Sequence, residues 1–224
     1  MDFSFSPEQD DLRREARAFL EANPSPTPEQ LGELGWAGIL RDDDFTFLDA
    51  AVLFEELGRV LHDGTFAADE IAAWTRDGEL AGRALATAYA LEAVGIGARA
   101  LELAIEYASG REQFGRKIGV YQAISHSLVD GYVAVELGRS LAYWAAWCVA
   151  EADPEVDLAV AAAKSQATEA AVLACEKAIQ ALGGIGFTWE HVLHRYYKRA
   201  LWLEGALGYG REHRAQVAKS LLQS

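Results

Sequence analysis

The sequence predicts an all-α protein whose long helices form an up-down bundle. Hydrophobic residues make up 51% of the 224 residues, and alanine, which has the highest helix propensity, is frequent among them. Apolar residues recur at helical spacing through several long stretches, and no stretch shows the alternation of a half-buried strand. Long helices joined by short loops are typical of an up-down bundle.

The start of the chain carries a helix-capping pattern. Ser6 can accept a hydrogen bond from a backbone N–H group, Pro7 suits the first helical position, and Gln9 completes a capping box. Further helix starts and ends follow from apolar spacing and from glycine and proline breaks. Helices are expected over residues 7–20, 27–34, 47–61, 80–109, 120–152, 155–182, 189–207 and 211–223.

The helical pattern weakens in one internal segment. Residues 62–79 lack a clear apolar period and contain two Asp-Gly turn dipeptides, so they are predicted to be a linker. This linker separates a helical segment at 1–61 from a C-terminal bundle domain at 80–224. Inside the first long helix of that domain, Gly95 and Gly97 predict close contact with neighbouring helices.

Charge and cysteine usage limit the partners and the location. The formal net charge of −14 argues against nucleic acid and anionic membrane surfaces as partners. Cys148 and Cys175 lie in apolar helical stretches, which predicts buried free thiols in a reducing compartment. The first residues show no signal-peptide pattern, and no uncharged apolar run reaches membrane-spanning length. We therefore expect a cytoplasmic protein.

Several common site signatures are missing from the sequence. The five histidines do not cluster at ligand spacing, and no Glu-x-x-His pair marks a di-iron bundle, so no metal is expected. No nucleophile elbow or phosphate loop occurs. The stretch Gly183-Gly184-Ile185-Gly186 is not a dinucleotide fingerprint, because it follows a predicted helix and not a strand.

Three stretches nevertheless suggest ligand contacts. Ile179–Thr188 puts three glycines in four positions. Glycine allows a ligand to approach the backbone closely, although helix ends also use glycine. Between 111 and 117, three cations surround Phe114, which suits a phosphate-bearing ligand with a flat ring, although a surface turn is the simpler interpretation. The basic residues of Arg195–Arg199 could bind an anion, or they could interact with the negative C-terminal end of their own helix's dipole.

Two motifs at the first two of these stretches carry a family resemblance. Residues 107–122 read Tyr-Ala-Ser-Gly-Arg-Glu-Gln-Phe-Gly-Arg-Lys-Ile-Gly-Val-Tyr-Gln, and residues 180–187 read Gln-Ala-Leu-Gly-Gly-Ile-Gly-Phe. In this order and at this separation, they resemble the two signatures in the C-terminal helical domain of the acyl-CoA dehydrogenase family. The resemblance covers about residues 80–224 and is weaker at residues 3–20, 35–38 and 55–59.

The resemblance implies a cofactor site shared between subunits. In this family, the C-terminal domain of one subunit holds the adenine and pyrophosphate end of a neighbour's flavin adenine dinucleotide (FAD). The residues that would do so here are Arg111, Phe114, Gln122, Gln180, Gly183 and Gly184. Arginine suits pyrophosphate, and glycine lets backbone N–H groups come close to it.

Two departures from the family pattern affect the expected activity. The family's middle β-domain, which holds the flavin ring, has only residues 62–79 in its place, and the N-terminal helical segment looks shortened. The family's usual base, a glutamate before a glycine, aligns with Leu207. Glu204, about one helical turn earlier, is the candidate base if the register shifts. The family's other base position falls near Leu85, with Glu92 two turns further on.

The resemblance therefore implies a subunit of an FAD-dependent acyl-CoA dehydrogenase, which removes hydrogen from the α and β carbons of an acyl-CoA thioester. The expected partner is a fuller paralogue, as in the unequal pairs of some steroid-degrading bacteria, or a second copy. Two alternatives are a helical scaffold without flavin binding and a self-sufficient enzyme using its helical cleft. Large aromatic residues are expected at interfaces or in the core: Trp74, Trp144, Trp147, Trp189 and Trp202.

Overall fold

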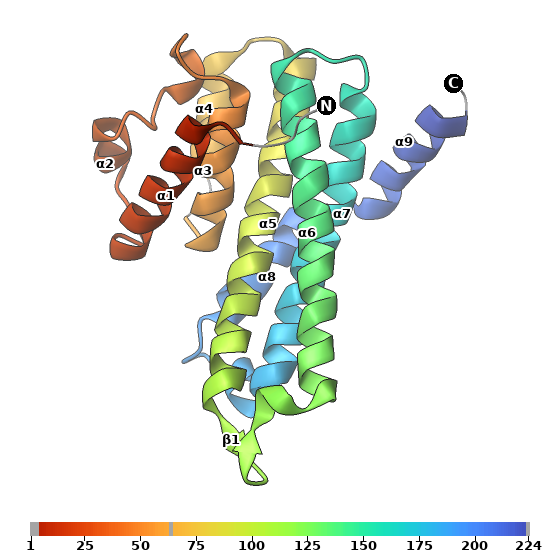
Figure 1. Cartoon of the computed structure of the whole chain (residues 1–224). Helices are drawn as coiled ribbons and strands as arrows, with labels where there is room; N and C mark the ends of the chain where they lie inside the picture. The colour runs from red at the N-terminus through yellow and green to blue at the C-terminus, as the bar shows by residue number, and fades with distance from the viewer. Residues whose placement is uncertain (1–4, 63–64, 223–224) are drawn as a thin grey trace.

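The computed structural model describes residues 5–62 and 65–222 of the chain. It confirms an all-α fold, in which a bundle of long helices carries a group of short helices on one side (Figure 1). The α-helices are α1 (Pro7–Ala22), α2 (Pro28–Glu33), α3 (Phe47–Arg59), α4 (Phe66–Trp74), α5 (Gly78–Gly110), α6 (Gln122–Ala150), α7 (Val156–Leu182), α8 (Leu193–Gly205) and α9 (Gly210–Leu222). The short elements are the 3-10 helices η1 (Ile39–Arg41), η2 (Ile118–Val120) and η3 (Gly183–Phe187) and the strands β1 (Glu112–Gln113) and β2 (Arg116–Lys117).

Three long antiparallel helices, α5, α6 and α7, form the body of the molecule. Helix α8 packs against α5 and α7, and α9 packs on α7 and projects from the side of the bundle (Figure 1). Helix α3 lies against α5, and α1, α2 and α4 gather around it near one end. The β1–β2 hairpin lies at the opposite end of the bundle. The group of short helices and the hairpin are thus separated by much of the length of α5.

The backbones of α3 and α5 touch at two glycines. A Cβ atom added to Gly58 would collide with the carbonyl oxygen of Glu92, and one added to Gly95 would collide with that of Glu55. Gly97 lies close to both α6 and α7 in the same way. The predicted close contacts at Gly95 and Gly97 are therefore confirmed, and they fix how the short helices sit on the bundle.

Buried residues of α1 and α3 and of the long helices belong to one hydrophobic cluster. The two cysteines are buried free thiols, as predicted. Burial raises the pKa of Cys148 to about 11 and that of Cys175 to about 12, so both thiols stay protonated near neutral pH. Of the aromatic residues expected at interfaces or in the core, Trp74, Trp144 and Trp147 are half-buried, whereas Trp189 and Trp202 are exposed.

The segment 62–79, predicted to be a linker, contains helix α4. Phe66 packs edge-on against Phe54 with their ring centroids 6.2 Å apart, and Trp74 stacks on Phe47 at 5.7 Å. In addition, the carboxylate of buried Glu70 accepts a hydrogen bond from the N–H of Gly38 at 2.9 Å. Because α4 has only nine residues, its apolar period is too short to recognise in the sequence.

The basic loop that follows α5 is also more ordered than the sequence predicts. It folds back on itself as the antiparallel β1–β2 pair. With two residues in each strand, there is no alternation for a sequence pattern to reveal. Helix α8 begins at Leu193 and not at residue 189, because the chain after the glycines continues through η3 and a turn.

Two stretches are long and apolar enough to cross a membrane by composition alone, Gly78–Gly110 and Val156–Phe187. Of their most apolar windows, 78% and 44% respectively are buried inside the protein. The first stretch is α5 and the second is α7 together with η3, and α5 and α7 pack against each other. Their contribution to the core accounts for much of this apolar character.

Candidate functional site

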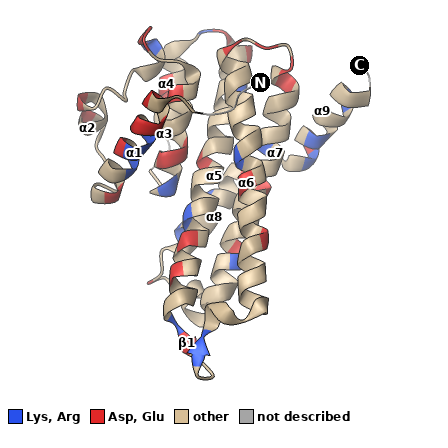
Figure 2. Cartoon of the chain, in the orientation of Figure 1, with Lys and Arg blue, Asp and Glu red and all other residues tan. Residues whose placement is uncertain are grey.

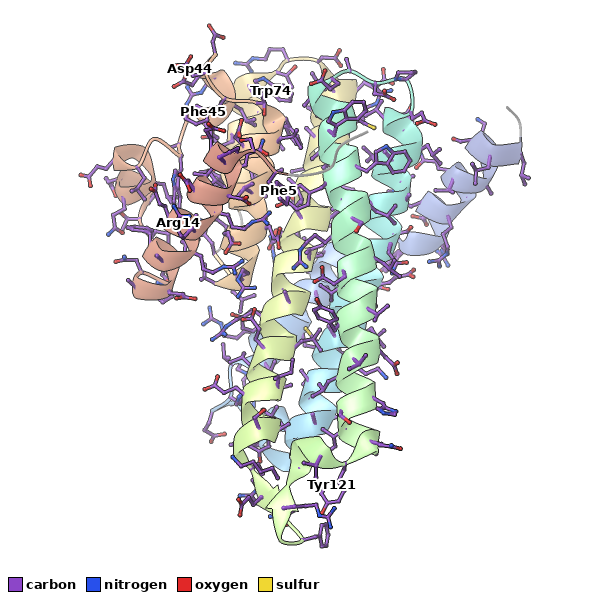
Figure 3. All side chains as sticks on the ribbon, viewed as in Figure 1. Phe5, Arg14, Asp44, Phe45, Trp74 and Tyr121 are labelled. Carbon is purple, nitrogen blue, oxygen red and sulfur yellow. The ribbon has the colours of Figure 1, made fainter. Side chains whose placement is uncertain are left out.

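A short hairpin closes the end of the bundle between α5 and α6. The carbonyl of Arg111 accepts a hydrogen bond from the N–H of Ile118 at 2.9 Å. Tyr121, at the base of the hairpin (Figure 3), donates its hydroxyl to the carbonyl of Gln113 at 3.2 Å. The guanidinium of Arg116 lies 5.8 Å from the centre of the Tyr121 ring. These contacts hold the hairpin against the start of α6.

The tip of the hairpin presents an aromatic ring to solvent. Phe114 and Gly115 form its two-residue loop and have φ angles of +52° and +76°. Positive φ at both positions is the geometry of a type I′ turn, which matches the twist of the strands. Glycine adopts this backbone freely, but it is uncommon for a bulky residue such as phenylalanine. The side chain of Phe114 is 91% exposed, so packing within the chain does not explain the aromatic ring.

The glycines in the turn after α7 have two different structural roles. Gly183 ends α7 with a φ of +65°, and a Cβ atom on Gly183 or Gly184 would meet nothing within 4 Å. Gly186 is buried, and a Cβ atom there would lie 2.7 Å from the carbonyl oxygen of Ile179. Gly186 is therefore required by packing, whereas Gly184 leaves open space beside an exposed backbone.

Chain topology brings the hairpin and the glycine turn to one end of the bundle. The C-termini of α5 and α7 and the N-terminus of α6 all lie there (Figure 1). The side chains of Arg111, Gln122 and Gln180 are exposed and make no hydrogen bond or ion pair among the described residues. A free guanidinium, free amides and open glycine backbone fit a phosphate-bearing cofactor with a flat ring. The individual roles of these residues remain predictions.

The candidate bases lie on α5, on α8 and just beyond α8. Leu207 stands in the turn before α9 with a φ of +61°, and its side chain is 49% exposed. Glu204 is half-buried in the last turn of α8. On α5, burial raises the pKa of Glu92, but Arg199 donates to both of its carboxylate oxygens at 2.6 and 2.9 Å. Leu85 is half-buried near the start of α5 and has no proton-accepting group.

A buried lysine of α7 contacts the last turn of α8. The ammonium group of Lys164 is fully buried and donates to the carbonyl oxygen of Leu203 at 2.8 Å. This bond satisfies a carbonyl in the last turn of α8. Burial lowers the pKa of Lys164 to about 8, and the nearby carboxylate of Glu204 opposes that shift. The signal in the sequence was a lysine that is the only charged residue between Asp157 and Glu169 in the alanine-rich stretch that forms α7.

A network of arginines and glutamates joins α1, α3, α5 and α6. Glu55 is only 2% exposed. It accepts hydrogen bonds from Nε of Arg139 at 3.0 Å and from the hydroxyl of Tyr143 at 2.7 Å. Its neighbour Glu56, also buried, is held by Arg17 through two hydrogen bonds of 2.6 and 3.0 Å. Sequence reasoning missed this network because its members come from four separate helices.

No group of three or more His, Cys, Asp and Glu residues in the described part of the chain has the arrangement of a metal site.

Comparison with known proteins identifies the architecture. The family model of the acyl-CoA dehydrogenase C-terminal domain matches residues 67–222. The chain belongs to the acyl-CoA dehydrogenase family. The matched region includes both motifs and all of the long helices, whereas α1, α2 and α3 lie outside it.

Named relatives place the chain within this family. The acyl-CoA dehydrogenase IpdE2 of Mycobacterium tuberculosis is 41% identical over 112 residues, which are 50% of this chain and 33% of that protein. The match thus spans about a third of the relative's length. The ChsE4–ChsE5 complex from the same species has a chain that aligns with a TM-score of 0.86 at 19% identity over 100% of both chains. A Tcur3481–Tcur3483 steroid ACAD aligns with a TM-score of 0.85 at 17% identity over 96% of this chain and 98% of that one. At these identities the structures show the shared fold alone.

Proposed function

We propose that this chain is a subunit of an FAD-dependent acyl-CoA dehydrogenase, and that the hairpin end of its bundle completes the flavin site of a fuller partner chain. The observation that carries the proposal is the meeting of the two family motifs at one end. There Arg111, Phe114, Gln122 and Gln180 are all exposed, beside the open backbone of Gly184.

The hairpin end would bind the adenine and pyrophosphate portion of the cofactor. Arg111 would neutralise the charge of the pyrophosphate, and the backbone at Gly183 and Gly184 could approach its oxygens closely. Phe114 offers a ring face for the flat adenine. When bound, FAD takes the β-hydrogen of an acyl-CoA thioester as hydride while a base takes the α-proton. The contribution of this chain is to hold and orient the cofactor.

The partner would have to supply the flavin-ring domain. In the described part of this chain, the strands are limited to the two-residue pair of the hairpin. The usual base position holds Leu207, which cannot accept a proton. Both features favour a fuller acyl-CoA dehydrogenase chain as the partner over a second copy. The complexes named in the ChsE4–ChsE5 and Tcur3481–Tcur3483 structures make such a pairing reasonable.

Helix α6 offers a surface for that partner. Val129, Val133 and Leu137 recur at helical spacing and are 56%, 49% and 56% exposed. Gln122 lies seven residues before Val129 and therefore on the same side of the helix. The nearby carboxylate of Asp130 is paired with a lysine of this chain, so burying the stripe leaves no unpaired acidic group at that position. Val129 and Val133 belong to the half of α6 that begins at the hairpin, and Figure 2 shows α6 running from that end, so a partner seated on this stripe would reach the hairpin end.

Co-expression with a full-length paralogue from a neighbouring reading frame tests the proposal. We expect a stable complex that contains flavin, and activity on an acyl-CoA only when both chains are present. A complex without flavin, or two chains that do not associate, would contradict it.

The second candidate is a helical scaffold that associates with a partner but does not touch its flavin. The leucine aligned with the family's usual base position supports this alternative, because a leucine cannot take a proton. The two candidates differ in one respect: only the first makes the flavin content of the complex depend on Arg111.

A further inference from the structure

We propose that the hollow between α1, α3, α5 and α8 is a second anion site, which binds a small organic molecule bearing a phosphate group. Four arginines line this cavity of about 420 Å³. They are Arg17, Arg59, Arg99 and Arg195. Such a concentration is unexpected in a chain with a net charge of −14. The site does not depend on the proposed flavin function.

The arginines outnumber the carboxylates that pair with them. Arg17 is held by Glu56, and Arg59 donates to both oxygens of Glu102 at 2.7 Å. Arg99 also pairs with Glu102, at an N–O distance of 3.1 Å, although Arg59 already donates to both oxygens of that carboxylate.

The fourth guanidinium, that of Arg195, has no ion-pair partner among the described residues. Counting the exposed Glu21 at the rim as well, four positive groups face three negative ones. The remaining positive charge lies where Arg99 and Arg195 meet the cavity.

The floor of the hollow is held firmly. The hydroxyl of Tyr196 donates to the carbonyl of Arg59 at 2.5 Å and so ties the start of α8 to the end of α3. Residues at the start of α8 line the cavity, and the positive end of that helix's dipole adds to the positive potential there. Apolar side chains of Leu20, Val60 and Val192 form part of the wall.

This combination defines the chemical class of the ligand. The planar guanidinium of arginine suits phosphate oxygens, which it binds through two parallel hydrogen bonds. The volume lies within the range of small-molecule sites. The apolar wall favours an organic phosphate over the free ion. Arg17 and Arg59 come from α1 and α3, outside the region matched by the family model, whereas Arg99 and Arg195 lie within it, so the cavity forms where the matched domain meets the helices that precede it.

Isothermal titration calorimetry of the full chain with pyrophosphate, at low ionic strength, tests the site. We expect Arg195→Gln to weaken binding about tenfold or more, because it removes a charge-assisted contact. Arg99→Gln should act in the same direction. Because Arg195 is exposed and unpaired, the fold should be unaffected, which thermal unfolding can verify.

Two matched variants provide the controls. Lys198→Gln removes a positive charge from the helix that carries Arg195, and Arg14→Gln removes one from the helix that carries Arg17; neither residue lines the cavity. Both should bind pyrophosphate within about twofold of the unaltered chain, well below the effect of losing a charged contact. Absence of binding, or equal weakening in all variants, would overturn the proposal. Weakening by Arg111→Gln without weakening by Arg195→Gln would also overturn it, because it would place the phosphate at the hairpin end and leave the proposed function standing.

Discussion

The charged residues of this protein are used in opposite ways at two places. Where α1, α3 and α6 meet, Glu55 and Glu56 are buried and each is held by arginines of other helices. At the hairpin end, Arg111 and Gln122 are exposed and make no side-chain hydrogen bond among the described residues. Paired and buried groups hold a fold together, whereas free polar groups beside open backbone are available to a ligand. The comparison predicts that substitutions at the first place affect stability and that those at the second affect binding.

The largest loss of stability is expected from Glu55→Ala. This substitution leaves the hydroxyl of Tyr143 buried without its acceptor and removes one of the two carboxylates that pair with the half-buried guanidinium of Arg139. Removing one partner of a buried ion pair costs about 3–5 kcal/mol, which urea denaturation can measure. The control Asp157→Ala removes an exposed pair with Arg83 and should cost less than about 1 kcal/mol. Equal losses in the two variants would contradict the role given to the buried network.

The second expected effect is a pH dependence from Lys164. Burial lowers its pKa from 10.5 to about 8, so the unfolded chain binds more protons than the folded chain between these values. The contribution of Lys164 to stability should therefore rise with pH across this window, by about 3 kcal/mol in total. His213, whose pKa burial also lowers, titrates below it. The two cysteines act in the opposite direction, because burial raises their pKa values, but they are the same in Lys164→Met. The free energy of unfolding of the unaltered chain minus that of Lys164→Met should therefore increase by about 3 kcal/mol from about pH 7.5 to 10.5; parallel curves would refute the assignment.

The third prediction is that two glycines of the turn after α7 respond differently to replacement by alanine. Gly186→Ala places a Cβ atom 2.7 Å from the carbonyl of Ile179, and such overpacking costs about 1–3 kcal/mol. Gly184→Ala meets no atom within 4 Å, so the free energy of unfolding should hardly change. In the complex, however, Gly184→Ala should reduce flavin binding, because its methyl group keeps the cofactor from the backbone. If Gly184→Ala destabilises the chain as much as Gly186→Ala, the division is wrong.

The order and positions of the long helices could be predicted from the sequence because each contributes many apolar residues at helical spacing. The capping box at Ser6 and Gln9 was equally local and is present, with hydrogen bonds of 3.1 and 3.2 Å. Helix α4 and the hairpin were missed because each is too short to show a period. The predicted site residues reach one end of the bundle, but that proximity followed from the family resemblance and from the topology, not from the motifs themselves.

The features that could not be predicted from the sequence depend on contacts between residues far apart in the chain. Arg17 and Glu56 are 39 positions apart, and Arg139 and Glu55 are 84 apart. Lys164 is one of five charged residues in α7, and only the structure shows that it is buried and hydrogen-bonds to a carbonyl in the last turn of α8. Similarly, the run Arg195–Arg199 divides in the structure: Arg195 lines the cavity, Lys198 lies over the ring of Trp189 at 4.1 Å, and Arg199 pairs with Glu92.

The flavin content of the purified two-chain complex is the most direct test of the proposed half-site. With Arg111→Ala in this chain, we expect about a tenfold or greater loss of flavin affinity with the complex still assembled, because a charged contact to the pyrophosphate is lost. Arg14→Ala, which removes an exposed arginine from α1 at the other end of the molecule (Figure 3), should leave the flavin content unchanged. Unchanged flavin in Arg111→Ala would contradict the half-site and favour the scaffold.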